Sequence, residues 1–236
     1  MQVPNIQVVS EALQLPAPKG GRRLEAYWAA PAGSGPHPGL LVIHEIHGLN
    51  DDIRSICRRL AGEGYAALAV DLFSDRSRPV CMLQIFYGLL IRPLASGTLT
   101  DLQSSLAYLR QRPEVLDAHV GAIGFCMGGS YALQLACVDD GMRAASVFYG
   151  QNPRPLEAVA QACPIVGSYP GRDFTARAAK ALETALTRTD IPHDLKTYPQ
   201  ARHSFFNSTG SAYDPAASAD AWQRTLAFFE IHLRPH

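Results

Sequence analysis

The chain has 236 residues, of which 47% are hydrophobic and 18% charged, a composition that excludes a disordered protein. Its 21 basic and 21 acidic residues balance, so neither nucleic acid nor an anionic membrane is an expected partner. The first ten residues lack the charge and apolar run of a secretory signal, and no stretch is long enough to span a bilayer. We therefore expect a cytoplasmic protein.

Strand and helix patterns alternate along the chain. The expected strands are 5–11, 22–29, 39–43, 65–70, 120–125, 144–149, 164–168 and 193–198. The expected helices are 51–64, 101–112, 129–138, 175–189 and 216–233. The first two strands, joined by the segment PAPKGG, have the mixed pattern of edge strands, and residues 73–97 are poorly patterned. The alternation predicts one α/β domain over residues 1–236, with a mainly parallel sheet and helices on both faces.

A candidate nucleophile lies where the strand expected at 120–125 meets a helix. The run Gly124-Phe125-Cys126-Met127-Gly128 has the G-x-C-x-G pattern of a nucleophile elbow, with sulfur in place of oxygen. The two glycines relieve crowding around a strained turn. The helix N-terminus is expected to lower the pKa of the Cys126 thiol, and the Met127 amide is expected to stabilise an oxyanion.

Other interpretations of this turn are weaker. A purely structural cysteine is the plain alternative, as we expect for Cys137 inside an apolar helix. A phosphate-binding loop is disfavoured because the chain lacks GxxxxGK[ST] and a suitably placed GxGxxG. The odd number of cysteines and the absence of CxxC spacing predict neither a disulfide framework nor a zinc site.

A base and an acid are expected downstream of the nucleophile, at the carboxyl ends of later strands. His203 follows the strand expected at 193–198, whereas the other downstream histidines lie at a strand start, in the last helix or in the tail. Asp173 follows the strand expected at 164–168, although it is also suited to cap the next helix. The order predicts a triad in which Asp173 orients His203 and His203 activates Cys126.

Glu45 is a fourth candidate, directly after the apolar strand at 39–43 and within His44-Glu45-Ile46-His47. This H-E-x-H run is one residue shorter than the helical zinc motif and stands at a strand end, so no metal is expected. The segments VIHEIHGLN, GFCMGG, GRDF and ARHSF together resemble the dienelactone hydrolase family, and the likeness covers about residues 20 to 233.

The resemblance implies an α/β-hydrolase fold and cleavage of small esters or lactones through a thioester acyl-enzyme. The sequence itself shows no sign of a cofactor, so none is expected. Glu45 would pair with the thiol in the resting enzyme and help to activate it when substrate binds. The amides of Ile46 and Met127 would form the oxyanion hole.

The chain departs from the family pattern after the HSF segment. The family has an arginine there that helps to hold a substrate carboxylate, and this chain has Asn207. Candidates to replace that charge are Arg76, Arg78 and Arg92. The expected substrate contacts are Ser204, Phe174, Arg92 and Asn207.

Two other functions stay open at this point. The first is a broader carboxylesterase or thioesterase that needs no substrate carboxylate, which Asn207 favours. The second is a non-catalytic redox-responsive protein in which Cys126 is oxidised. The presence of Glu45, Asp173 and His203 together with Cys126 disfavours this second alternative, because an oxidation sensor needs neither the aspartate nor an oxyanion hole. Both a monomer and a homodimer are compatible with the sequence.

Overall fold

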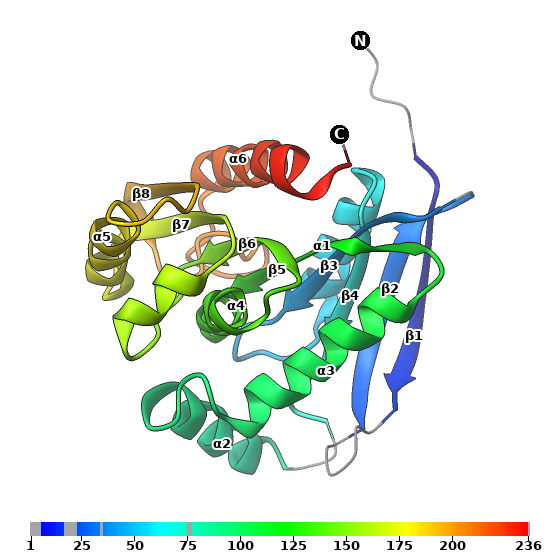
Figure 1. The fold of residues 1–236 in the computed structure, drawn as a ribbon, viewed down its shortest axis with the longest axis horizontal. Helices are drawn as coiled ribbons and strands as arrows, with labels where there is room; N and C mark the ends of the chain where they lie inside the picture. The colour runs from blue at the N-terminus through cyan, green and yellow to red at the C-terminus, as the bar shows by residue number, and fades with distance from the viewer. Residues whose placement is uncertain (1–5, 17–22, 34, 75–76, 236) are drawn as a thin grey trace.

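Strands of uninterrupted apolar sequence form the centre of the protein. The computed structural model describes residues 6–16, 23–33, 35–74 and 77–235 (Figure 1). Within these residues eight strands form one sheet in the order β1-β2-β4-β3-β5-β6-β7-β8. The strands are β1 (Val8–Leu15), β2 (Leu24–Pro31), β3 (His37–Ile43), β4 (Ala66–Val70), β5 (Val115–Phe125), β6 (Met142–Phe148), β7 (Ile165–Arg172) and β8 (His193–Arg202).

The sheet is mainly parallel, as the alternation of strands and helices predicts. Strand β2 runs antiparallel to β1 and β4, and every pair from β4 through β8 is parallel. In β4 and in the GLLVI part of β3 every residue is buried, because helices cover both faces. Burying each Leu, Val or Ile side chain of these strands stabilises the fold by about 1.5–3 kcal/mol.

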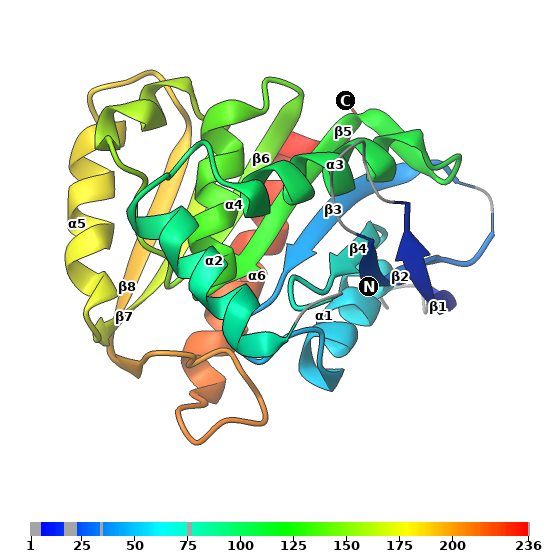
Figure 2. The same ribbon diagram turned by 90° about the horizontal axis from the view of Figure 1, so that it is seen from below.

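Helices cover the two faces of the sheet (Figures 1 and 2). One apolar cluster joins the sheet to α1 (Asp51–Gly62) and α6 (Pro215–Leu233). The other joins it to α3 (Gly97–Gln111), α4 (Met127–Val138) and α5 (Thr175–Leu186), with a 3-10 turn at Leu156–Gln161. Helix α2 (Arg78–Leu90) lies at the periphery and packs against α3. No helix of the described residues is both long and apolar enough to cross a membrane.

Helix α1 shows how a local pattern fixes an element. Its buried residues recur at helical spacing, as expected from the sequence: Ile53, Ile56, Cys57, Leu60 and Ala61. The side chain of Asn50 accepts a hydrogen bond from the Ile53 amide at 3.1 Å and caps the N-terminus.

Some expectations from the sequence were wrong. Helix α2 occupies a segment without a recognisable pattern, because apolar residues lie on both its inner and its outer side. Of the two strands expected at an edge, only β1 is one. Strand β2 is an inner strand between β1 and β4, and its apolar residues are all buried. The first strand is β1 (Val8–Leu15) rather than 5–11. Residue 5 and most of the PAPKGG segment lie outside the described residues.

Candidate active site

The candidate site lies at the carboxyl ends of the parallel strands, where loops leave the sheet. Cys126 directly follows β5, Asp173 follows β7 and His203 follows β8. Glu45 lies two residues beyond the end of β3. Because these strands lie next to one another or a few positions apart in the sheet, the four side chains share one region although they are distant in sequence.

Cys126 has the strained backbone of a nucleophile elbow, with a positive φ of 56°. The flanking glycines are sterically required, as expected. A Cβ atom at Gly124 would overlap the carbonyl oxygen of Gly128, and one at Gly128 would overlap that of Ile43. The backbone of Cys126 is held by a hydrogen bond of 3.0 Å from its amide to the carbonyl of Phe148 on β6. The turn therefore presents the thiol at the strand end while the backbone segments pack tightly around it.

Three side chains form a continuous chain of contacts. The Nε2 atom of His203 lies 3.0 Å from the Sγ atom of Cys126, and Nδ1 lies 2.7 Å from Oδ2 of Asp173. The hydroxyl of Thr175 also donates a hydrogen bond to Oδ2 of Asp173, at 2.5 Å. Burial tends to raise the pKa of Asp173, but the hydrogen bonds from His203 and Thr175 outweigh it and keep that pKa below its ordinary value. Asp173 is thus an anion that faces the imidazole.

The pKa of the Cys126 thiol differs from the expected one. Burial, and then the negative charge of Glu45, raise the pKa of Cys126 to about 12. The Met127 amide does lower it, as expected for a helix N-terminus, but this effect is smaller. The prediction of a lowered thiol pKa was therefore wrong for the resting protein, because the helix N-terminus is outweighed by desolvation and by a neighbouring anion.

Glu45 is almost completely buried, with 5% of its surface exposed. Tyr149 donates a hydrogen bond from its hydroxyl to Oε1 of Glu45 at 2.8 Å, and Asn207 donates from Nδ2 to Oε2 at 3.2 Å. In this structure the thiol faces His203, and the carboxylate of Glu45 is held by these two neutral donors. The expected resting pair between Glu45 and the thiol is thus replaced by a Tyr149–Glu45–Asn207 network.

Sequence reasoning missed Tyr149. It directly follows β6, so its position at a strand end was a signal that could have found it. Its backbone has a positive φ of 43°, and its side chain is fully buried between Glu45 and His203, whose ring centroid lies 5.1 Å away. This backbone strain at a non-glycine residue is typical of functional sites.

The expected substrate contacts have different surroundings. Asn207 is buried, and its Oδ1 accepts hydrogen bonds from the amide and hydroxyl of Thr209. It is therefore a structural partner of Glu45 and not an open contact. Phe174 is 67% exposed and stacks on the ring of His203, with centroids 5.3 Å apart. Ser204 is half-buried beside His203 and has a positive φ of 61°.

The candidate arginines lie at different distances from the site. Nη2 of Arg78 donates to the carbonyl oxygen of Ile46 at 2.6 Å, so this guanidinium lies beside the segment expected to carry an oxyanion amide. Arg92 is exposed beyond the other end of α2, a helix that spans roughly 20 Å. Arg76 lies outside the described residues.

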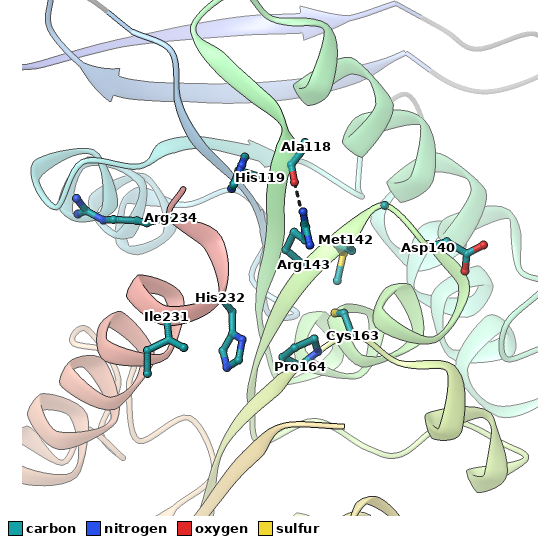
Figure 3. A pocket seen from close by; sticks show the side chains of 11 residues that line it. Ala118, His119, Asp140, Met142, Arg143, Cys163, Pro164, Ile231, His232 and Arg234 are labelled. Atoms are coloured by element: carbon teal, nitrogen blue, oxygen red, sulfur yellow. Dashed lines mark hydrogen bonds between the residues drawn. The ribbon is translucent and has the colours of Figure 1, made fainter. Parts of the chain in front are cut away.

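A groove lies at the end of the sheet opposite the candidate active site (Figure 3). It has a volume of about 640 Å³ and lies between the start of β6 and the end of α6, and Arg143 on its wall donates to the carbonyl of Ala118. Among the described residues expected at the active site, none lines this groove. Across the described part of the chain, no cluster of three or more His, Cys, Asp or Glu side chains is placed to hold a metal ion.

The comparisons with known proteins agree with the observed fold and identify a family. The family model described as "Dienelactone hydrolase family" matches residues 24–233. A "Putative carboxymethylenebutenolidase" of Saccharolobus solfataricus is 33% identical over 88% of this chain and 94% of its own. One of Escherichia coli K12 is 30% identical and covers 98% of this chain and 90% of its own.

The solved structures similar to this chain include members of the same family. The crystal structure of a putative dienelactone hydrolase from Klebsiella pneumoniae subsp. pneumoniae MGH 78578 superposes with a TM-score of 0.83 at 27% identity, covering 95% of this chain and 99% of its own. A dienelactone hydrolase-like promiscuous phosphotriesterase from metagenomic libraries also gives 0.83, at 26% identity over 96% of this chain and 99% of its own.

Proposed function

Since the chain belongs to the dienelactone hydrolase family and is a hydrolase of carboxylic ester bonds, we propose that it cleaves small esters or lactones with Cys126 as the nucleophile. The observation that carries this proposal is the continuous contact of Cys126 Sγ with His203 and of His203 with Asp173, at 3.0 and 2.7 Å. A nucleophile, a base and an orienting carboxylate in this arrangement are the requirements for acyl transfer.

The proposed reaction has two halves. Sγ of Cys126 attacks the carbonyl carbon as its proton passes to Nε2 of His203, and the anion of Asp173 stabilises the imidazolium. The amides of Ile46 and Met127 stabilise the oxyanion. The C–O bond to the alcohol then breaks, His203 returns the proton to the alcohol oxygen, and a thioester remains. Water, deprotonated by His203, cleaves the thioester and restores the thiol with release of the carboxylic acid.

The raised pKa of the Cys126 thiol determines its protonation state in the resting enzyme. With a pKa of about 12, Cys126 is protonated at neutral pH, so the nucleophile forms only when His203 takes the proton during attack. In this proposal Glu45 keeps the empty site unreactive, because its charge opposes a thiolate beside it. Tyr149 and Asn207 hold Glu45 in that position until substrate binds.

One observation favours the broader alternative, a carboxylesterase or thioesterase that needs no substrate carboxylate. The side chain of Asn207 is neutral, buried and already bonded to Glu45, so it offers no positive charge to an anionic substrate. Arg78, next to Ile46, is the described arginine best placed for that task. A panel of neutral and anionic esters and lactones distinguishes the two: a carboxylate requirement that Arg78→Ala abolishes would support Arg78, and equal rates with neutral esters would support the broader enzyme.

The central test is hydrolysis of p-nitrophenyl acetate by the whole chain. We expect Cys126→Ala to lower turnover by about 10³-fold or more, and thiol alkylation to inactivate the wild type. Cys137→Ala is the matched control, since Cys137 is a buried thiol of α4 without a place in the triad. Unchanged turnover in Cys126→Ala would overturn the proposal. We also propose that the described elements form a single catalytic domain, because all the strands share one sheet.

A further inference from the structure

Helix α2 has an unusual outer surface. From Pro79 to Ile91 the sequence PVCMLQIFYGLLI has no charged residue. The inner side of the helix is buried through Cys81, Ile85 and Gly88. The outer side is apolar as well, and its exposed residues are Val80 (45%), Leu83 (72%), Tyr87 (51%) and Leu90 (57%). A helix that is apolar on nearly every side is normally buried on all of them. Apart from the exposed Gln84, the outer surface of α2 is apolar, and no partner among the described residues covers it.

The outer residues are spaced in a way that suits a helix pair. Val80, Leu83, Tyr87 and Leu90 follow one another at intervals of three, four and three residues, the spacing of a two-helix seam. These four residues, called the seam below, are spaced symmetrically about residue 85. Two copies of the helix can therefore pair in opposite directions with apolar residues facing each other along the whole seam. A two-fold symmetric contact requires such a self-complementary surface.

The apolar surface of α2 is large enough to contribute most of one side of a protein–protein interface. Phe86 and Ile91, 41% and 64% exposed, widen the seam. Six half-exposed side chains of this size present on the order of 500 Å² of apolar surface, as much as the largest patches found on monomeric proteins. This is more than half of the roughly 800 Å² that each partner contributes to a standard-sized interface. The other large exposed apolar residues of the described chain lie outside α2: Val9, Ile46, Phe174, Tyr213 and Ile231.

We propose that the outer face of α2, formed by Val80, Leu83, Tyr87 and Leu90, is a dimer interface that packs antiparallel against α2 of a second copy of this chain. In this arrangement Leu83 contacts Tyr87 of the partner and Val80 contacts Leu90. No charge has to be desolvated within the seam, since its flanking charges, Arg78 and Arg92, lie at the two ends. The balanced net charge of the chain adds no repulsion between the copies.

A second copy fits this face better than a lipid surface does. A helix that lies on a membrane has a polar, usually basic face opposite its apolar one. The face of α2 opposite the seam is packed against the protein: Ile85 accepts a hydrogen bond from the Tyr131 hydroxyl through its carbonyl, and Gly88 lies against Ser96 and Tyr131. Pairing would also hold the start of α2, where Arg78 bonds Ile46 beside the proposed active site.

The test is sedimentation velocity of the full chain up to the high micromolar range. We expect the wild type to reach twice the monomer mass of 25.6 kDa, and Leu83→Glu and Tyr87→Lys each to remain monomeric. An equimolar mixture of these two variants should recover a dimer, because the antiparallel seam brings the introduced carboxylate of one copy against the introduced ammonium group of the other. Ile231→Glu, a change at an exposed apolar residue of α6, is the matched control and should still dimerise.

Several results would overturn the proposal. These are a wild type that stays monomeric at all concentrations, a Leu83→Glu variant that sediments like the wild type, and a mixture that fails to pair. Circular dichroism and thermal melting of each variant verify that the fold is retained. Flotation with phosphatidylcholine–phosphatidylglycerol vesicles tests the lipid alternative: vesicle binding by a monomeric wild type, lost in Leu83→Glu, would assign the face to a membrane instead.

Discussion

Replacing Glu45 by Gln removes the charge that opposes a thiolate at Cys126 while keeping the shape of the side chain. The oxygen of the new amide accepts the hydrogen bond from Asn207, and its nitrogen donates to Tyr149 Oη, so the buried network is preserved. Burial of the thiol, the largest cause of its raised pKa, does not change. We therefore expect the Glu45→Gln substitution to lower the pKa of Cys126 without returning it to its ordinary value.

The size of the effect follows from Coulomb's law. Two like charges roughly 5 to 8 Å apart repel by about 2–3 kcal/mol at an effective dielectric constant near 20, which corresponds to about 2 pKa units. A fall from about 12 by this amount raises the thiolate fraction about 100-fold at pH 8. A thiolate of lower pKa is also a weaker nucleophile, so the net gain in alkylation rate is about tenfold.

The measurement is the rate of iodoacetamide alkylation at Cys126 in the absence of substrate, followed by mass spectrometry of the modified peptide. The pH at which the rate rises should move downward in Glu45→Gln, because its thiol loses the proton at lower pH. Asp52→Asn is the control: its carboxylate bonds Ser208 and is not among the charges that raise the thiol pKa. An alkylation rate that is unchanged or slower in Glu45→Gln would refute this electrostatic reasoning.

Three further predictions concern the triad, the elbow and a buried thiol. Asp173→Asn should lower kcat for ester hydrolysis by roughly 10³–10⁴-fold with little change in KM, because the amide no longer fixes the tautomer of His203. Gly128→Ala should lower the free energy of unfolding in urea by more than about 2 kcal/mol, whereas Gly62→Ala, which meets no atom within 4 Å, should not. Burial raises the pKa of Cys57 from 9.0 to about 12, so the folded chain keeps this proton while the unfolded chain loses it, and stability should fall as pH rises from 9 towards 12. Cys57→Ala should make this fall shallower by about 1.4 kcal/mol per pH unit, as measured by urea unfolding at several alkaline pH values.

The fold was predictable wherever local pattern and burial agree. The strand and helix around Cys126 lie where expected, because an apolar run, a glycine turn and a helix follow one another directly. Helix α2 was not predictable from periodicity, since its outer apolar face removes the contrast between a buried and a solvated side. The inner position of β2 depends on pairing with β4, about forty residues later, which no local pattern encodes.

The candidate site was predictable in part for a similar reason. Cys126, Asp173 and His203 each follow a strand, and the rule that loops at carboxyl ends meet was enough to expect their contact. Their catalytic roles stay predictions. The partners of Glu45 come from 104 and 162 residues away, and their hydrogen bonds depend on packing that the sequence does not reveal. The thiol pKa was mispredicted because the cost of burial is visible only in three dimensions.

The dispersal of the site over four strand ends also has a consequence for folding. His203 meets Cys126 across 77 residues of chain, and Asn207 meets Glu45 across 162. Contacts of such long sequence separation form late, since the loops between them must close first, and parallel strand pairing is slow for the same reason. During refolding, helical signal should therefore return before the full reactivity of the thiol site, which makes enzyme activity a reporter of the last step in assembling this sheet.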